Sequence, residues 1–336
     1  MLLIKTDALG NEEWHSTYGR GINDEGRALE ILPDGSGYVI AGNSTNGLGN
    51  TDILISKVDN NGTIIISDTV GNPNFNEEVS DLLIYNNTEI ILAGSTSNVK
   101  PKEKIPGVVD AYDFFTPKRD LNLAPISWDS RLGYGGTDKA YGIAQNTVGD
   151  IIIFGTSDRS VEGDTNKGLN NFLVKTIDVN GTDHNGDLVT GNQNDQLASR
   201  MSDASNGEQI MVGTSVYDGG SDIFISRRNS AKNATGAYEL SKVERTTGKA
   251  IVEARGGGYL ILGSIIRNGN SDVYLVRTNT RGAVIWEKIF GGDNEDLPGD
   301  LKQLEDGSIV FTCTITLDNQ QKIGLIKTNE NGELKD

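Results

Sequence analysis

Tyr38-Val39-Ile40-Ala41-Gly42 is a short apolar run that ends in glycine, and close copies of it recur along the chain. The copies lie at 90–94, 151–155, 210–213 and 260–263, with a sixth at 309–313 in which Cys313 replaces the glycine. A second apolar run ends in a basic residue and recurs every 50 to 61 residues, at Lys5, Lys57, Lys118, Lys175, Arg227, Arg277 and Lys327. A period of this length predicts one supersecondary unit repeated along the chain.

Each repeat divides into four strands, which we name A to D in chain order. The stretches at 300–304 and 308–314 flank the turn Glu305-Asp306-Gly307 and represent strands A and B of one repeat. The stretches at 273–278 and 283–290 flank a glycine turn and represent strands C and D of the repeat before it. Such turns are typical of hairpins, and no segment has the periodicity of an amphipathic helix.

Six of these repeats predict an all-β fold: a β-propeller of six four-stranded blades in one domain spanning residues 1–336. Packing small sheets face to face covers both apolar faces of each sheet and leaves only short edges. The expected blades are 25–71, 77–134, 138–191, 195–243, 245–292 and 295–336. We expect residues 2–19 to complete the last blade, with 12–19 as its outer strand. The alternative is a propeller of seven blades, one of them incomplete.

The chain is acidic, with a formal net charge of −17 and a pI of about 4.6. Nucleic-acid binding requires a basic patch that neutralises phosphates. The densest basic stretch, 100–104, is interrupted by a proline and a glutamate, so we exclude nucleic acid as a partner. The net charge favours a soluble monomer, and it also leaves open an affinity for cations.

The single cysteine, Cys313, excludes an internal disulfide framework. No run of about 18 apolar residues is present, so we expect no membrane-spanning helix. Residues 1–4 run straight into the repeat pattern and leave no room for a signal peptide. Two interpretations remain: an extracellular or cell-surface protein whose targeting segment has been removed, and a cytoplasmic protein.

The stretch 272–278 (Asp-Val-Tyr-Leu-Val-Arg-Thr), followed by Gly282 and 286–292 (Trp-Glu-Lys-Ile-Phe-Gly-Gly), resembles the bacterial β-propeller repeats called SBBP. Matching pieces occur at 52–57, 222–227, 14–19 and 134–136. The resemblance covers essentially the whole chain, and it implies a propeller of the kind found in secreted and cell-surface proteins of bacteria and archaea. It carries over no catalytic residue. The chain departs from the pattern at Pro117 and Lys322, and its fourth blade lacks the tryptophan.

Two sets of residues recur from blade to blade. An acidic column precedes strand C and consists of Asp52, Asp113, Asp222 and Asp272, with Asn170 in the third blade. A ring of ligands is one interpretation, and a side-chain bond that shapes the loop before the strand is the favoured one. Trp14, Trp128 and Trp286 match in strand D, where packing between blades is favoured over a sugar-binding platform.

The local cluster closest to a metal site is 183–187, Asp-His-Asn-Gly-Asp. Asp183, Asn185 and Asp187 provide the alternating oxygen ligands of the first half of a calcium loop, but no late carboxylate follows. A plain polar hairpin is the favoured interpretation. Ca²⁺ is the one cofactor that the sequence suggests.

The connections from strand D to the next strand A gather acidic residues at one end of the blades. They are Asp24, Glu25, Glu77, Glu78, Asp138, Asp195, Glu244, Glu295 and Asp296. The long loops 95–111 and 156–170 are expected at the same end, and binding residues are often carried by such loops. We expect a rim that binds a metal ion or a cationic ligand; the alternative is that these carboxylates only cap strand ends.

Catalytic arrangements find little support, because His15 and His184 are the only histidines and no acidic pair is singled out among 47 acidic residues. The expected function is therefore a non-catalytic propeller that binds a protein or a carbohydrate or serves as a scaffold. The alternative is a polysaccharide hydrolase or lyase with acidic catalytic residues.

Overall fold

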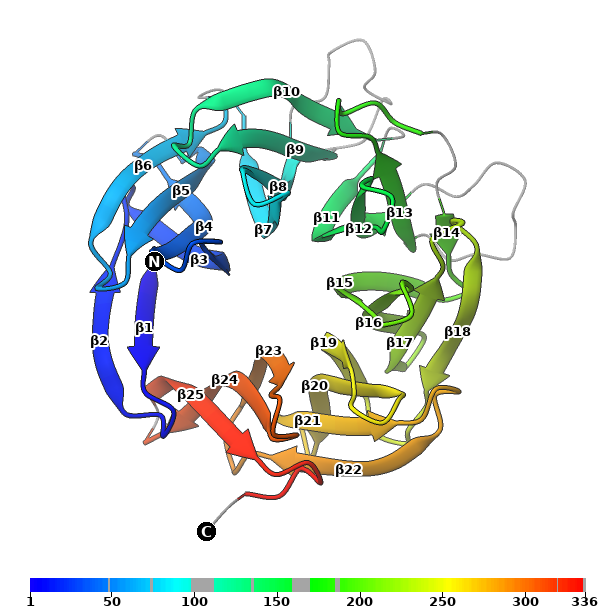
Figure 1. Ribbon diagram of the computed structural model, residues 1–336. Coiled ribbons are helices and arrows are strands. Elements are labelled where there is room, and N and C mark those ends of the chain that lie inside the picture. The colour runs from blue at the N-terminus through cyan, green and yellow to red at the C-terminus, as the bar shows by residue number, and fades with distance from the viewer. Residues whose placement is uncertain are drawn as a thin grey trace. The chain divides into compact units, whose positions relative to one another are not determined.

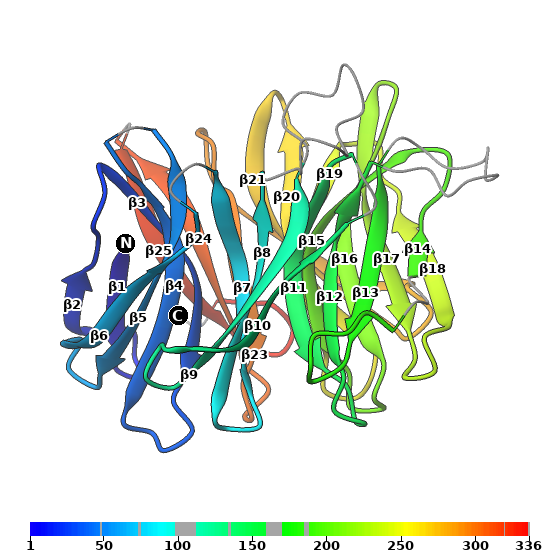
Figure 2. The same cartoon turned by 90° about the horizontal axis from the view of Figure 1, so that it is seen from above.

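The structure is a computed structural model of the 336-residue chain, and it describes residues 1–47, 49–72, 75–97, 112–133, 136–158, 170–184, 188–318 and 320–334. These ranges contain strands and turns but no helix. A helix long and apolar enough to cross a membrane is therefore also absent from them. The predicted fold class is confirmed: the protein is an all-β propeller with six blades (Figures 1 and 2).

Each blade is an antiparallel sheet in which the strands lie side by side in chain order. Blade one consists of β3 (Asn23–Ile31), β4 (Gly37–Thr45), β5 (Thr51–Asp59) and β6 (Ile64–Val70), and blade two of β7 (Glu77–Tyr85), β8 (Glu89–Thr96), β9 (Asp113–Asp120) and β10 (Pro125–Leu132). Blade three consists of β11 (Asp138–Gln145), β12 (Ile151–Ser157), β13 (Asn171–Ile177) and β14 (Leu188–Thr190), and blade four of β15 (Asp195–Asp203), β16 (Gln209–Tyr217), β17 (Gly220–Arg228) and β18 (Ala234–Leu240). Blade five consists of β19 (Thr246–Glu253), β20 (Tyr259–Arg267), β21 (Asn270–Thr278) and β22 (Val284–Phe290), and blade six of β23 (Leu297–Gln303), β24 (Ile309–Leu317) and β25 (Gln320–Thr328). β1 (Leu2–Thr6) and β2 (Glu12–Thr17) form a separate two-stranded sheet.

The chain divides into two compact units, Met1–Arg159 with Val174–Gly186 and Ser160–Leu173 with Asp187–Asp336. In each unit the core lies between consecutive blades. In the first unit, Val39 and Ile55 of blade one share a buried cluster with Leu82 and Leu92 of blade two. A corresponding cluster joins blades four and five in the second unit. Because strands B and C lie within this packing, they can be buried along their whole length, as in β12 and β13.

Blade six contains the beginning of its own strand D. The bridge between Thr328 and Leu334 occupies the position that the Thr278–Val284 pair has in blade five. β2 pairs with β1. The completion of the last blade by residues 12–19 stays a prediction, as does the assignment of the whole chain to one domain.

The glycine that recurs in strand B is required by a bulge in strand A. In blade three the register shifts between Ala140 and Gly142 of β11, while β12 continues without interruption. A Cβ on Gly155, the partner of Ala140, would overlap the carbonyl oxygen of Lys139. The backbone of Gly155 is not left-handed, so close approach of the two strands requires the glycine.

The same close approach recurs in four other blades, at Gly42, Gly94, Gly213 and Gly263. Blade six differs because Cys313 has a side chain. Its register shift is wider, running from Pro298 to Leu301 in β23, and it passes over Thr312 in β24. The sequence exception at Cys313 therefore coincides with a different bulge.

The tryptophans of strand D connect consecutive blades. Trp128 of β10 donates a hydrogen bond from its indole nitrogen to the carbonyl oxygen of Val179 in blade three, at 2.9 Å. Trp14 of β2 donates in the same way to Asn60 of blade one, at 3.0 Å. Both acceptors lie in the turn between strands C and D of the following blade. These contacts agree with the packing role favoured above.

Replacing Trp128 with phenylalanine keeps an aromatic ring in place and removes the indole donor. We expect the free energy of unfolding to fall by about 1 kcal/mol beyond the loss caused by Trp286→Phe, because a typical hydrogen bond contributes about that much. Among the described residues the Trp286 indole donates no hydrogen bond, so it is the matched control. Urea denaturation measures both, and equal losses would contradict a role for the Val179 bond.

Candidate functional site

Paired acidic side chains lie at the ends of the blades, next to the glycine that follows strand D. Asp52 stands at the start of β5 and Glu77 at the start of β7. A Cβ on Gly71 would lie 2.5 Å from Asp52 Oδ1 and 2.7 Å from Glu77 Oε2. The acidic column before strand C and the acids that begin the next strand A therefore meet at one place, although the sequence presents them as separate features.

The arrangement recurs at other blade junctions. Gly133 is flanked by Asp113 and Asp138, Gly291 by Asp272 and Asp296, and Gly191 by Asn171 and Gln196. The last pair corrects an expectation, because the third-blade member of the column is Asn171 and not Asn170. Its partner at this junction is Gln196, the residue next to Asp195. Aligning Gly191 with Gly133, whose neighbours Asp113 and Asp138 stand at the same distances along the chain, would have located both residues. An amide pair occupies this junction where other junctions have two acids.

Asp138 has a strongly raised pKa. Its side chain is 0% exposed, and burial raises the pKa from 3.8 to about 7, with a further contribution from the negative charges of Asp113 and Asp158. The hydrogen bond with Ser157 and the charge of Lys175 act in the opposite direction. The folded protein therefore favours the protonated form of Asp138 well above the pH at which an ordinary aspartate ionises.

Two of the buried acids hold the loops that connect the blades. Glu77 Oε2 accepts a hydrogen bond from the backbone amide of Asn72, at 3.0 Å. Asp296 accepts hydrogen bonds from the backbone amides of Gly292, at 3.1 Å, and Thr316, at 3.0 Å. Burial raises the pKa of Glu77, while the hydrogen bond from Asn72 lowers it. These carboxylates bind the loop between strand D and the next strand A.

The remaining acids of the predicted rim are less buried. Glu25 forms an ion pair with Arg27, at 2.7 Å, and Glu78 forms one with Lys139, at 3.2 Å. Asp24 and Asp195 are half-buried and accept backbone hydrogen bonds, and Glu295 is exposed. The structure thus divides the rim residues into buried acids (Glu77, Asp138 and Asp296) and more accessible acids. Ligand binding by the rim stays a prediction.

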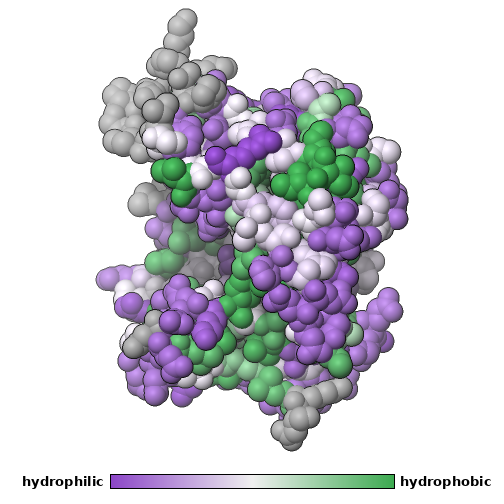
Figure 3. Space-filling model, turned by 90° about the vertical axis from the view of Figure 1, so that its left-hand side faces the viewer, coloured by the Kyte–Doolittle hydropathy of each residue, from purple (hydrophilic) through white to green (hydrophobic). Residues whose placement is uncertain are grey.

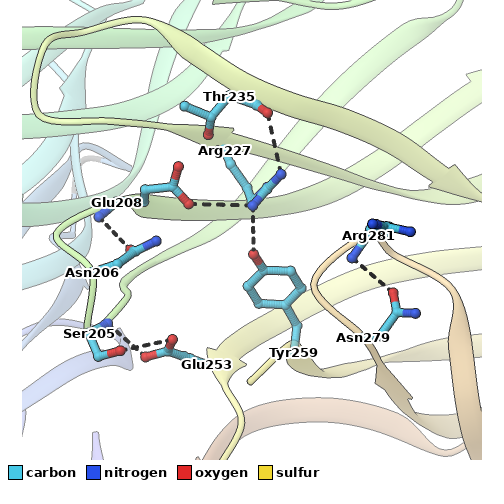
Figure 4. Close-up of polar contacts among 9 residues, drawn as sticks. All are labelled: Ser205, Asn206, Glu208, Arg227, Thr235, Glu253, Tyr259, Asn279 and Arg281. Atoms are coloured by element: carbon cyan, nitrogen blue, oxygen red, sulfur yellow. Dashed lines mark hydrogen bonds and ion pairs between the residues drawn. The ribbon is translucent and has the colours of Figure 1, made fainter. Parts of the chain in front are cut away.

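The recurring basic residue of strand C makes structural contacts. Figure 4 shows Arg227 of β17 between the strands of blades four and five. Its guanidinium lies 3.4 Å from Glu208 Oε2 and donates hydrogen bonds to the Tyr259 hydroxyl, at 3.2 Å, and to the Thr235 carbonyl oxygen, at 3.3 Å. Arg227 therefore joins strand C of blade four to strand D of the same blade and to the first residue of β20 in blade five.

The predicted calcium ligands are only partly described. Asn185 and Asp187 lie outside the described residues. Asp183 Oδ2 lies 2.8 Å from the ammonium group of Lys175. In the described ranges no group of three or more His, Cys, Asp or Glu side chains is arranged to hold a metal ion.

A polar pocket of about 470 Å³ opens at the end of blade five. Its lining consists of Arg267, Asn268, Asn270, Asp272, Ile289, Gly291, Gly292 and Asp293. One wall is the turn between β20 and β21, in which Asn268 and Gly269 have the positive φ angles of a tight hairpin turn. The other wall is the segment that follows β22.

Asn270 connects the two walls of this pocket. Its side-chain amide donates hydrogen bonds to the carbonyl oxygens of Gly292, at 3.1 Å, and Asn294, at 2.7 Å. Asp272 lies below it, and burial together with the charge of Asp296 raises the pKa of Asp272. The acid pair of this junction is thus continuous with the pocket. The sequence did not predict this pocket, because its walls come from two turns about 25 residues apart.

Comparisons with known proteins identify the fold and no family. No family model and no curated protein matches the chain. A Dyadobacter fermentans protein of unknown function matches with a TM-score of 0.53 at 13% identity, over 78% of this chain and 81% of that one. The Kuenenia stuttgartiensis hydrazine synthase matches with a TM-score of 0.58 at 11% identity, over 95% and 87%. Sqt1 from Chaetomium thermophilum matches with a TM-score of 0.51 at 12% identity, over 97% and 73%. At such identities the likeness concerns the fold alone.

Proposed function

We propose that this protein is a non-catalytic binding propeller that takes a short carbohydrate in the blade-five pocket. The observation that carries the proposal is the lining of that pocket. Its volume lies in the range of about 300 to 1,000 Å³ typical of small-molecule sites. Arg267 and Asn268 supply donors, Asp293 supplies acceptors, and Ile289 supplies an apolar surface for the C–H face of a sugar ring.

The acid pair below the pocket favours binding over catalysis. Asp296 accepts two backbone hydrogen bonds, so it serves as a fixed acceptor for the loop. Asn171 and Gln196 occupy the same place in another junction and cannot exchange protons. Since two amides can stand in place of the two acids at one junction, we infer that the pair has a structural role at each junction.

The resemblance to SBBP repeats supports an extracellular or cell-surface location, and the negative net charge of −17 supports a protein that remains monomeric. Both belong to the same proposal. Fractionation of the producing cells tests the location, and recovery in the cytoplasmic fraction would contradict it.

A glycan array followed by calorimetric titration of the best glycan tests the proposed binding. We expect Arg267→Ala and Asp293→Ala each to weaken binding at least about tenfold, because each removes hydrogen bonds to the sugar hydroxyls. Arg281→Ala is the matched control, since Arg281 is exposed in the turn between β21 and β22 and should bind as the wild type does. Unchanged affinity of both pocket variants would contradict the assignment.

The competing function is a polysaccharide hydrolase or lyase. The raised pKa of Asp272 inside the pocket is the observation in its favour, because a protonated acid can serve as a general acid. A reducing-end assay with the glycan that binds best decides between the two. Release of new reducing ends by the wild type, with loss of this activity in Asp272→Asn, would replace the binding proposal.

A further inference from the structure

β1 and β2 have the register of strands C and D of a blade. Lys5 pairs with Trp14, as Arg277 pairs with Trp286 in blade five. In both hairpins the register shifts directly after the basic residue. The N-terminal hairpin is therefore the outer half of a repeat.

This outer half contacts blade one in the way that strand D of blade two contacts blade three. Trp14 donates to the carbonyl oxygen of Asn60, and the Tyr18 hydroxyl donates to the carbonyl oxygen of Gly62, at 2.7 Å. Leu3 packs against a cluster of Tyr18, Ile40 and Val58, in which Ile40 is 5% exposed. β1 and β2 thus cover the outer part of the blade-one face.

The inner part of that face is uncovered. Leu29 of strand A lies opposite Ile40 of strand B, and it is 43% exposed. The equivalent residues of blades two to six are Leu82 at 3%, Ile143 at 7%, Met201 at 5%, Ile251 at 1% and Leu301 at 6%. Ile31, on the same face as Leu29, is 61% exposed. A large apolar side chain as exposed as Leu29, at a position that is buried in five other blades, marks an interaction surface.

The edge of β1 is open as well. In the five four-stranded sheets strand C pairs with strand B on one side and strand D on the other, whereas among the described strands β1 pairs only with β2. Figure 3 faces the side of the molecule on which β1, β2 and β6 lie, and apolar side chains form patches between hydrophilic ones there. An open strand edge next to an apolar face is a template for another strand.

We propose that this site binds one further A–B β-hairpin of the same repeat, which comes from outside residues 1–336 and completes a four-stranded blade with β1 and β2. The second unit shows the chemistry of the contact. There, Ala250, Leu260 and Leu262 of the A–B hairpin of blade five share a buried cluster with Leu301 and Phe311 of blade six. Leu301 and Phe311 are the equivalents of Leu29 and Ile40. The occupant therefore presents small and branched apolar residues in strand alternation.

This arrangement differs from the completion of blade six by residues 12–19. Blade six begins its own strand D at Leu334, which leaves β2 free to serve as strand D of the additional blade. The two arrangements give β1 different neighbours, so they can be distinguished by experiment.

The test extends the full chain with a copy of residues 246–272 placed directly before Met1. The shared register makes Met1 the equivalent of Val273, so the extension supplies strands A and B with their natural turn. We expect amide exchange in β1 to slow by about tenfold or more and the thermal midpoint to rise. Leu29→Asp should lower the midpoint of the extended chain by several degrees more than that of the original chain. The matched control is an extension in which the copies of Leu260 and Leu262 are changed to aspartate, and it should confer neither effect.

Unchanged exchange in β1 on extension, or equal effects of Leu29→Asp in both chains, would overturn the proposal. Light scattering of the original chain, which measures its oligomeric state, provides a further test. A dimer that already protects β1 would make a second copy the occupant and would also overturn it.

Discussion

Replacing Gly155 with valine is expected to lower the free energy of unfolding by about 3 kcal/mol or more. The new Cβ would overlap the carbonyl oxygen of Lys139 and would lie 2.6 Å from Cζ of Phe114 in the preceding blade. The carbonyl belongs to the strand backbone and Phe114 is 0% exposed, so neither neighbour can move without disturbing the packing between blades two and three.

Urea denaturation of Gly155→Val beside Gly47→Val measures this effect. No heavy atom lies within 4 Å of the Cβ position of Gly47, and its backbone is not left-handed, so the control should lose well under about 1 kcal/mol. Similar losses in both variants would show that the recurring glycine is not fixed by the close approach of strands A and B.

Replacing Asp138 with asparagine is expected to stabilise the protein at pH 8 and to have little effect at pH 4. The pKa of Asp138 is about 7 in the folded protein against 3.8 in the unfolded chain, so the folded state keeps its proton over this interval and the unfolded state does not. The contribution of protonated Asp138 to the free energy of unfolding is fully present below about pH 4, and it is lost as the pH rises towards 7. The loss is on the order of 4 kcal/mol above pH 7, and asparagine, which resembles the protonated acid, avoids it.

Denaturation of both proteins between pH 4 and pH 8 provides the measurement. The reverse substitution, Asn171→Asp, is the matched control, because it places an acid in the junction that has an amide pair. We expect it to destabilise the protein at pH 8 more than at pH 4. Identical pH dependence of the wild type and Asp138→Asn would mean that Asp138 is ionised in the folded state throughout this range.

The sequence was sufficient to predict the fold because the repeat is visible in local patterns. Alternating apolar runs, hairpin turns and the terminal glycine of strand B predicted antiparallel four-stranded units, and five sheets of the structure are such units. The sequence alone does not distinguish between two reasons for this glycine, a positive φ angle and close strand approach. The structure decides for close approach, because the bulge in strand A depends on how two strands pair.

The candidate site was less accessible to sequence reasoning. The burial of Glu77, Asp138 and Asp296 depends on the preceding blade, which local sequence does not reveal. The shift from Asn170 to Asn171 arose after the long B–C connection of blade three, where spacing no longer fixes the register. The blade-five pocket unites turns that neither motif nor periodicity links.

Amide hydrogen exchange of the native protein tests the repeated-blade account most directly. The account predicts that the slowest amides fall in strands B and C of every blade, such as β4 and β5 in blade one and β20 and β21 in blade five, because these strands are paired on both sides. Strands D, such as β22, should exchange faster. Protection that fails to recur from blade to blade, or that is strongest in strands D, would contradict it.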